Sequence, residues 1–130
     1  MNSLYAILDR LGPYVLSILR VIVSLLFLQH GLAKMIGIPI PEPQLMGLLP
    51  PAANIEVVGS ALLLVGIYTR IVALIMSVEM ALVYFMVRSA KSFYPLVNGG
   101  ELEVLFCILF FYLAFTGAGP WSVDRLAKIP

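Results

Sequence analysis

Residues 55–87 read IEVVGSALLLVGIYTRIVALIMSVEMALVYFMV, two apolar runs that fold back on one another at residues 68–70. Each run carries one carboxylate, Glu56 in the first and Glu79 in the second. At 1.5 Å per helical residue, Glu56 lies about 20 Å and Glu79 about 15 Å from Thr69. A helical hairpin therefore places two acids at similar depth on neighbouring helices. Acids inside an apolar span are costly, so such positions favour a functional role.

The composition indicates an integral membrane protein of one domain, residues 1–130. The chain is 62% hydrophobic and 12% charged, with a mean hydropathy of +1.04, whereas soluble domains are about 45–50% apolar and about 25% charged. A net charge of +1 supplies no basic surface for nucleic acid, which excludes that class of partner.

Windows of about 20 apolar residues match the hydrocarbon thickness of a bilayer, and the sequence contains four of them. The predicted spans are residues 14–34, 52–68, 71–88 and 101–116. We therefore predict an all-α fold, a polytopic four-transmembrane-helix bundle.

Three segments outside the spans complete this prediction. Residues 2–12 are amphipathic and predict an interfacial N-terminal segment, which Gly12-Pro13 is expected to interrupt before the first span. Five prolines in residues 38–51 predict a loop at the membrane surface. The basic residues near the span ends favour cytoplasmic termini, in a bacterial or archaeal cytoplasmic membrane.

One face of the first span is polar over its whole height. At 100° per residue, five side chains fall within an arc of about 80°; they are Arg20, Ser24, Phe27, Gly31 and Lys34. Arg20 is interpreted as an anchor that extends to the interface.

The ionisable residues of all four spans gather at one end. His30 and Lys34 end the first span, Glu56 begins the second, Arg88 and Lys91 end the third, and Glu101 and Glu103 begin the fourth. Buried charges persist when paired, so we expect Glu56 to pair with Lys34 or Arg88, and Glu101 with His30. Glu101 and Glu103 are about 200° apart on a helix, so both cannot face inward.

Five sequence motifs carry a family resemblance. They are HGLAK at residues 30–34, Glu56 followed by VVGSALLLVGIYTR, Glu79-Met80, NGGE at residues 98–101 and GAGPWSVD at residues 117–124. In this order and spacing they resemble the DoxX family of small four-helix membrane proteins. The resemblance implies a four-helix bundle. It also implies a range of functions: subunits of quinone-linked sulfur or thiol oxidation, maturation factors for redox enzymes, and eukaryotic receptors or chaperones.

Candidate roles follow from these positions. We assign His30, Glu56 and Glu79 as the proton-exchanging, catalytic residues, and we assign ligand binding to Lys34, Arg88, Gly100 and Glu101. The alternatives are that His30 is an interfacial histidine bonded to an acid, and that Glu56 and Glu79 are structural partners of Lys34 and Arg88.

Two classes of function fit the sequence. The first is a redox-associated membrane subunit that binds a quinone or similar amphipathic ligand in the polar end, as part of a quinone-linked oxidoreductase complex if it is catalytic. The second is a non-catalytic scaffold, chaperone or small-solute carrier. The single Cys107 excludes dithiol chemistry within one chain, and neither metal nor haem ligation is expected.

The expected partners are the lipid bilayer and a redox protein that supplies electrons. A homo-oligomer is an alternative, because the side chains of Phe106, Phe110, Phe111 and Phe115 are expected to face outward, toward lipid or another subunit.

Overall fold

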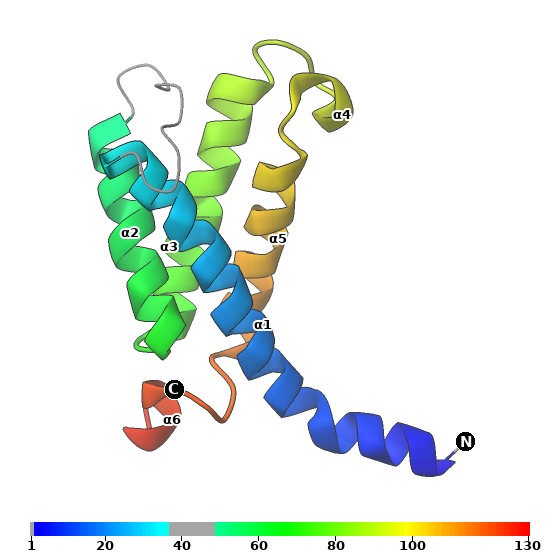
Figure 1. Ribbon diagram of the computed structural model, residues 1–130. Coiled ribbons are helices and arrows are strands. Elements are labelled where there is room, and N and C mark those ends of the chain that lie inside the picture. Colours follow the sequence, from blue (N-terminus) through cyan, green and yellow to red (C-terminus); the bar gives the residue numbers. More distant parts are fainter. Residues whose placement is uncertain (1, 37–48) are drawn as a thin grey trace.

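The computed structural model describes residues 2–36 and 49–130, with the side chains of residues 34, 36 and 49–52 outside that description. All secondary structure in this part of the chain is helical, which confirms the all-α class. The elements are α1 (Asn2–Ile36), α2 (Leu49–Val65), α3 (Thr69–Val83), the π-helical turn η1 (Tyr84–Arg88), α4 (Pro95–Asn98), α5 (Glu101–Thr116) and α6 (Val123–Leu126). In Figure 1, α1, α2, α3 and α5 lie side by side, and we refer to them as the four packed helices.

Helix α1 is continuous, so the predicted interruption at Gly12-Pro13 is wrong. Pro13 lies inside the helix, where its ring removes one backbone hydrogen bond and favours a bend rather than a complete break. Figure 1 shows the first third of α1 leaving the other helices at a steep angle. This segment is exposed along its length, and Leu4, Ile7 and Leu8 are all about half exposed. That this segment lies in the membrane interface stays a prediction.

The ends of α2 differ from the predicted span. The sequence predicts a proline-rich loop over residues 38–51, and residues 38–48 of that loop lie outside the described residues. Helix α2 begins at Leu49, so Pro50 and Pro51 belong to its first turn, where a missing N–H removes no helical bond. The helix ends at Val65 because Gly66 adopts a φ of 76°, a conformation that terminates helices.

The four packed helices form two close pairs, α1 with α2 and α3 with α5, and α2 also packs on α3. Glycines permit the close approaches. A Cβ at Gly31 would lie 2.9 Å from Val57 Cγ2, and a Cβ at Gly59 would lie 2.4 Å from Met76 Sδ. Small residues at these contacts let helices associate where lipid is as apolar as the side chains.

The core lies between these helices. Phe27, Leu63, Met76, Phe110 and Leu113 are at most 2% exposed, and the rings of Phe27 and Phe110 meet edge to face at 5.1 Å.

The prediction that four phenylalanines of α5 face outward is therefore wrong for two of them. Phe106 and Phe110 are buried, whereas Phe111 and Phe115 are exposed. Because α5 is apolar on every side, its sequence pattern does not reveal which face is covered.

Two helical stretches of the described chain are long and apolar enough to cross a membrane, Asn2–Ala33 and Thr69–Arg88. The apolar stretch Ala53–Val65 of α2 is shorter, and α5 has 16 residues. That α2 and α5 also span the membrane stays a prediction.

Candidate functional site

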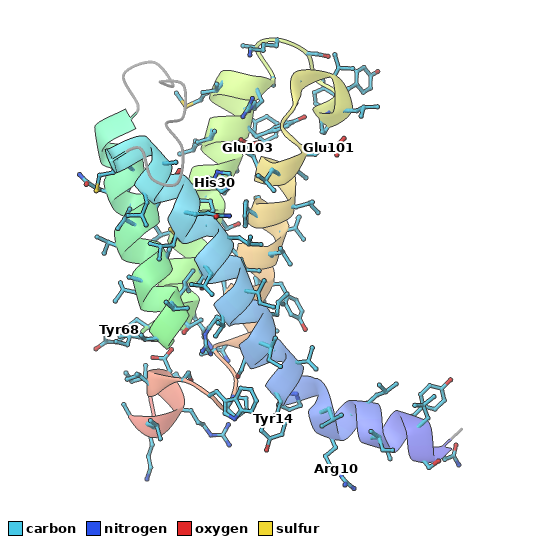
Figure 2. All side chains as sticks on the ribbon, viewed as in Figure 1. Arg10, Tyr14, His30, Tyr68, Glu101 and Glu103 are labelled. Atoms are coloured by element: carbon cyan, nitrogen blue, oxygen red, sulfur yellow. The ribbon has the colours of Figure 1, made fainter. Side chains whose placement is uncertain are left out.

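The four packed helices have two ends of different chemistry. At the first, which we call the acidic end, α1 and η1 finish while α2 and α5 begin. Figure 2 shows His30, Glu101 and Glu103 there, and Tyr14 and Tyr68 at the opposite end, which we call the Tyr68 end. The predicted polar face of α1 connects the two, because Arg20, Ser24, Phe27 and Gly31 are all buried. The structure thus shows that this face is turned toward the interior, with the side chain of Lys34 outside the described residues.

A small cavity lies among the helices at the acidic end. Its volume is about 30 Å³, and its lining residues are Phe27, His30, Glu56, Met80, Val83, Leu102, Glu103 and Phe106. All four packed helices contribute to it, and three of the eight side chains are ionisable. The ring of His30 stands edge-on to Phe106, with ring centres 6.0 Å apart. Ionisable groups from distant parts of the sequence therefore line one small cavity.

Glu56 is the most deeply placed of these groups. Its side chain is fully buried, although it lies in the second turn of α2. Gly31 explains how it is covered, since a Cβ at this position would lie 3.0 Å from Glu56 Cβ. The HG pair of the HGLAK motif thus combines a titratable ring with the glycine that lets α2 approach it.

Glu103, rather than Glu101, is the acid that α5 directs inward. Glu101 is exposed, whereas the Glu103 side chain is 14% exposed and its Oε1 lies 3.0 Å from Arg88 Nη2. A second bond joins Arg88 Nε to the same oxygen at 3.3 Å. The predicted pairing of Glu101 with His30 is therefore wrong, because the first turn of α5 presents the other of its two acids to the cavity. The partner of Arg88 is Glu103 and not Glu56.

The π-helical turn η1 sets the position of this ion pair. It follows α3 directly and contains both Tyr84 and Arg88. A π-turn inserts an extra residue into the helix, which rotates the following side chains, and such turns are frequent at functional sites.

The NGGE motif forms a compact entry to α5. The Asn98 side chain donates to Ser92 O at 2.7 Å, and its Oδ1 accepts from Gly100 N at 2.7 Å. A Cβ at Gly100 would lie 2.8 Å from the Tyr84 ring. Gly100, predicted to bind ligand, thus has its N–H engaged within the motif and is packed against η1.

Glu79 lies near the cavity without lining it. It is half-buried on α3 and directly precedes Met80, a cavity residue. Among the residues that the structure describes, no group of three or more His, Cys, Asp or Glu side chains could hold a metal ion.

Comparison with known proteins agrees with the motifs. The profile of the DoxX family matches residues 15–89, which include His30, Glu56, Glu79 and Arg88. The chain belongs to the DoxX family. A protein of Haemophilus influenzae, described as uncharacterized, is 42% identical over 126 residues that cover 91% of this chain and 94% of that protein. No solved structure matches the chain. DoxX proteins are membrane proteins and are often associated with redox chemistry.

The Tyr68 end of this DoxX protein is organised by Arg20, whose importance the sequence did not reveal. The Arg20 side chain is 1% exposed and donates to three backbone carbonyls: Ala118 O, Trp121 O at 2.6 Å and Leu64 O at 3.5 Å. Arg20 is therefore a buried clamp that joins α1, α2 and the segment after α5, and the predicted interfacial anchor is wrong. The signal available in the sequence was its place on the polar face with Ser24 and Phe27.

Asp124 completes this clamp, and its role was also not predicted from the sequence. Its two carboxylate oxygens accept from Tyr68 N at 2.7 Å and Thr69 N at 2.9 Å, which satisfies the first N–H groups of α3. A Cβ at Gly66 would lie 2.5 Å from Ser122 Cβ. The GAGPWSVD motif is thus a structural element that fixes the turn between α2 and α3.

Proposed function

We propose that this DoxX protein is a redox-associated membrane subunit that binds a quinone or similar amphipathic ligand at the acidic end. In this proposal four helices cross the membrane, both termini are cytoplasmic, and a partner protein supplies the electrons. The supporting observation is the cavity lined by His30, Glu56 and Glu103, with Glu56 fully buried. An acid retained at such a position within a membrane domain favours a role in proton or ligand handling.

The residue types suit proton exchange. A bound quinone would take up or release electrons and protons together. Imidazole titrates near neutral pH, and a carboxylate accepts or returns a proton when its surroundings change. His30 and Glu56 would therefore hold and transfer protons at this end, and Arg88 would orient Glu103 through their ion pair.

The size of the cavity limits where the proposed ligand could bind. About 30 Å³ accommodates one or two water molecules, whereas small-molecule sites are commonly about 300–1,000 Å³. The polar groups suit a quinone headgroup but the volume does not admit one. In our proposal the headgroup therefore binds at the mouth of the cavity, and water inside connects it to Glu56.

A second function, that of a non-catalytic scaffold, chaperone or carrier, is favoured by the Tyr68 end. There the buried Arg20 holds backbone segments together, so this chain already uses one intramembrane charge for structure alone. The charges of the acidic end would then hold helices in register.

Binding of a quinone analogue to the protein in lipid nanodiscs separates the two functions. Glu56→Gln keeps the shape of the side chain while removing its charge, and His30→Ala removes the imidazole. We expect either change to weaken binding about ten-fold or more, as for loss of a charged hydrogen bond, with an unchanged melting temperature. Glu101→Gln, an exposed acid at the same end, is the matched control and should bind normally. Unchanged binding together with a lowered melting temperature would instead establish the scaffold.

A further inference from the structure

A second, larger cavity opens at the Tyr68 end, away from the proposed quinone site. Its volume is about 280 Å³. Its walls are formed by Pro13 of α1, Arg70 of α3, the loop that follows α5 and Arg125 of α6, together with Ile129 and Pro130. Segments from both halves of the sequence therefore shape one concave surface.

Two guanidinium groups give this cavity its charge. Arg70 Nη1 donates to Phe115 O at 3.0 Å, and a Cβ at Gly117 would lie 3.3 Å from Arg70 Nε, so the guanidinium lies against a bare backbone. Arg125 is exposed. Within the described part of the chain, neither guanidinium forms an ion pair with an acid or with the terminal carboxylate.

The acid in the cavity wall does not neutralise these arginines. Asp124 is buried, and both of its oxygens accept backbone N–H groups of Tyr68 and Thr69. Arg70 and Arg125, both exposed, thus line the cavity with donors that no acid of the described chain engages, and guanidinium groups match the geometry of phosphate oxygens.

The surroundings place the cavity at the level of lipid headgroups. Tyr14 and Trp121 pair at a ring distance of 5.4 Å, and such residues gather where a bilayer meets water. Pro13 belongs both to α1 and to the cavity wall, and the first part of α1 leaves the packed helices as an exposed amphipathic segment (Figure 1). A headgroup phosphate of a neighbouring lipid would therefore be at the height of Arg70 and Arg125.

We propose that this cavity binds the phosphate group of an anionic phospholipid, with Arg70 and Arg125 as its charged ligands. The lipid, rather than free phosphate, is the occupant because the cavity adjoins the interfacial segment and its acyl chains can extend along the apolar surface of α1. A basic residue near an anionic headgroup strengthens binding about five-fold. A zwitterionic lipid gains less, because its own cation opposes the arginines.

Native mass spectrometry of the full chain in mild detergent tests this proposal. Phosphatidylglycerol and phosphatidylcholine with identical acyl chains are titrated separately, and 1:1 adducts are counted. We expect wild type to bind phosphatidylglycerol at least about five-fold more tightly than phosphatidylcholine, and Arg125→Gln to lose about five-fold for phosphatidylglycerol alone. Arg70→Gln combined with Arg125→Gln should abolish the preference. Lys91→Gln, which removes an exposed charge at the acidic end, should leave it intact.

Four results would overturn the proposal. They are equal binding of the two lipids by wild type, a preference that survives the double substitution, an equal loss in Lys91→Gln, and displacement of phosphatidylglycerol by millimolar inorganic phosphate. The last would identify a free anion as the occupant. Melting temperatures of Arg125→Gln and wild type are compared alongside, and equal values show that an affinity loss in that variant is not caused by unfolding.

Discussion

At the scale of the residue, two buried charged side chains have different surroundings. Arg20 is surrounded by carbonyl groups that it satisfies, so its charge joins segments of backbone. Glu56 lines a cavity with His30 and Glu103, so its charge lies beside space that water can occupy. Burial alone does not separate a structural charge from a functional one. In our proposal, the groups around a buried charge show whether its role is structural or functional.

Replacing Arg20 should be among the most destabilising single changes. Arg20→Met retains the length of the side chain but leaves the carbonyls of Ala118 and Trp121 buried without a donor, at a cost of about 3 kcal/mol in the free energy of unfolding. Unfolding in sodium dodecyl sulfate, followed by circular dichroism, measures this cost. Arg10→Met, in the exposed N-terminal segment, is the control; a similar loss there would show that the clamp is not the cause.

Replacing either of two glycines of α1 by alanine should have different effects on the stability of the protein. Gly31→Ala places a methyl group 2.9 Å from Val57 Cγ2 and must separate α1 from α2, at a cost of about 1–3 kcal/mol. Gly12→Ala has nothing within 4 Å, and alanine favours a helix by about 0.5–1 kcal/mol. Thermal unfolding of both variants should therefore move the melting temperature down for Gly31 and leave it equal or higher for Gly12.

At the scale of the element, the helices of this protein are positioned by their ends. Helix α3 begins after Tyr68, a residue in the left-handed region at φ 49°, and the side chain that caps it comes from Asp124, 56 residues further along. Helix α5 begins after a loop that Asn98 holds together. The start of α3 thus depends on a segment remote from it, and the start of α5 depends on a local motif. Apolar helices have few polar groups of their own to cap their ends.

Removal of the α3 cap should loosen the turn between α2 and α3. Asp124→Ala leaves the N–H groups of Tyr68 and Thr69 without their acceptors, and loss of such a cap costs about 1 kcal/mol. Hydrogen exchange should become faster at residues 66–70 while the amides of α5 keep their protection. Uniform acceleration across the chain would mean that Asp124 supports the whole fold and not this turn.

At the scale of the whole molecule, the pairs α1–α2 and α3–α5 bring His30, Glu56 and Glu103 to one end. The structural clamp of Arg20 and Asp124 lies at the other end. In our proposal these ends lie on opposite sides of the membrane. A ligand at the acidic end and a lipid at the Tyr68 end would then act independently, because the apolar core around Phe110 and Leu113 separates them.

Single-cysteine labelling tests this topology. In a Cys107→Ser background, Lys91→Cys and Arg125→Cys each place one thiol at an exposed site on opposite ends of the packed helices. We expect a membrane-impermeant maleimide added to intact cells to label position 91, and to reach position 125 only after the membrane is opened. Labelling of both positions from the same side would contradict four spans.

The sequence by itself determined the class of this protein and the depth of its charged residues. Hydropathy identified an all-α membrane protein, and the rise of 1.5 Å per residue located His30, Glu56 and the acids of residues 101–103 at one end. These conclusions need only distances along the chain, which regular helices fix in advance.

The tertiary structure decided which way side chains face and which distant groups meet. In the folded chain Glu103, rather than Glu101, pairs with Arg88. Phe106 and Phe110 are buried, and Arg20 bonds to the carbonyls of Ala118 and Trp121. The pattern of α5 could not reveal its covered face, because an all-apolar helix has no polar side to contrast with it. The partners of Arg20 are backbone carbonyls, two of them about 100 residues away and one 44 residues away. Carbonyls occur at every position, so only the folded chain shows which of them a buried guanidinium meets.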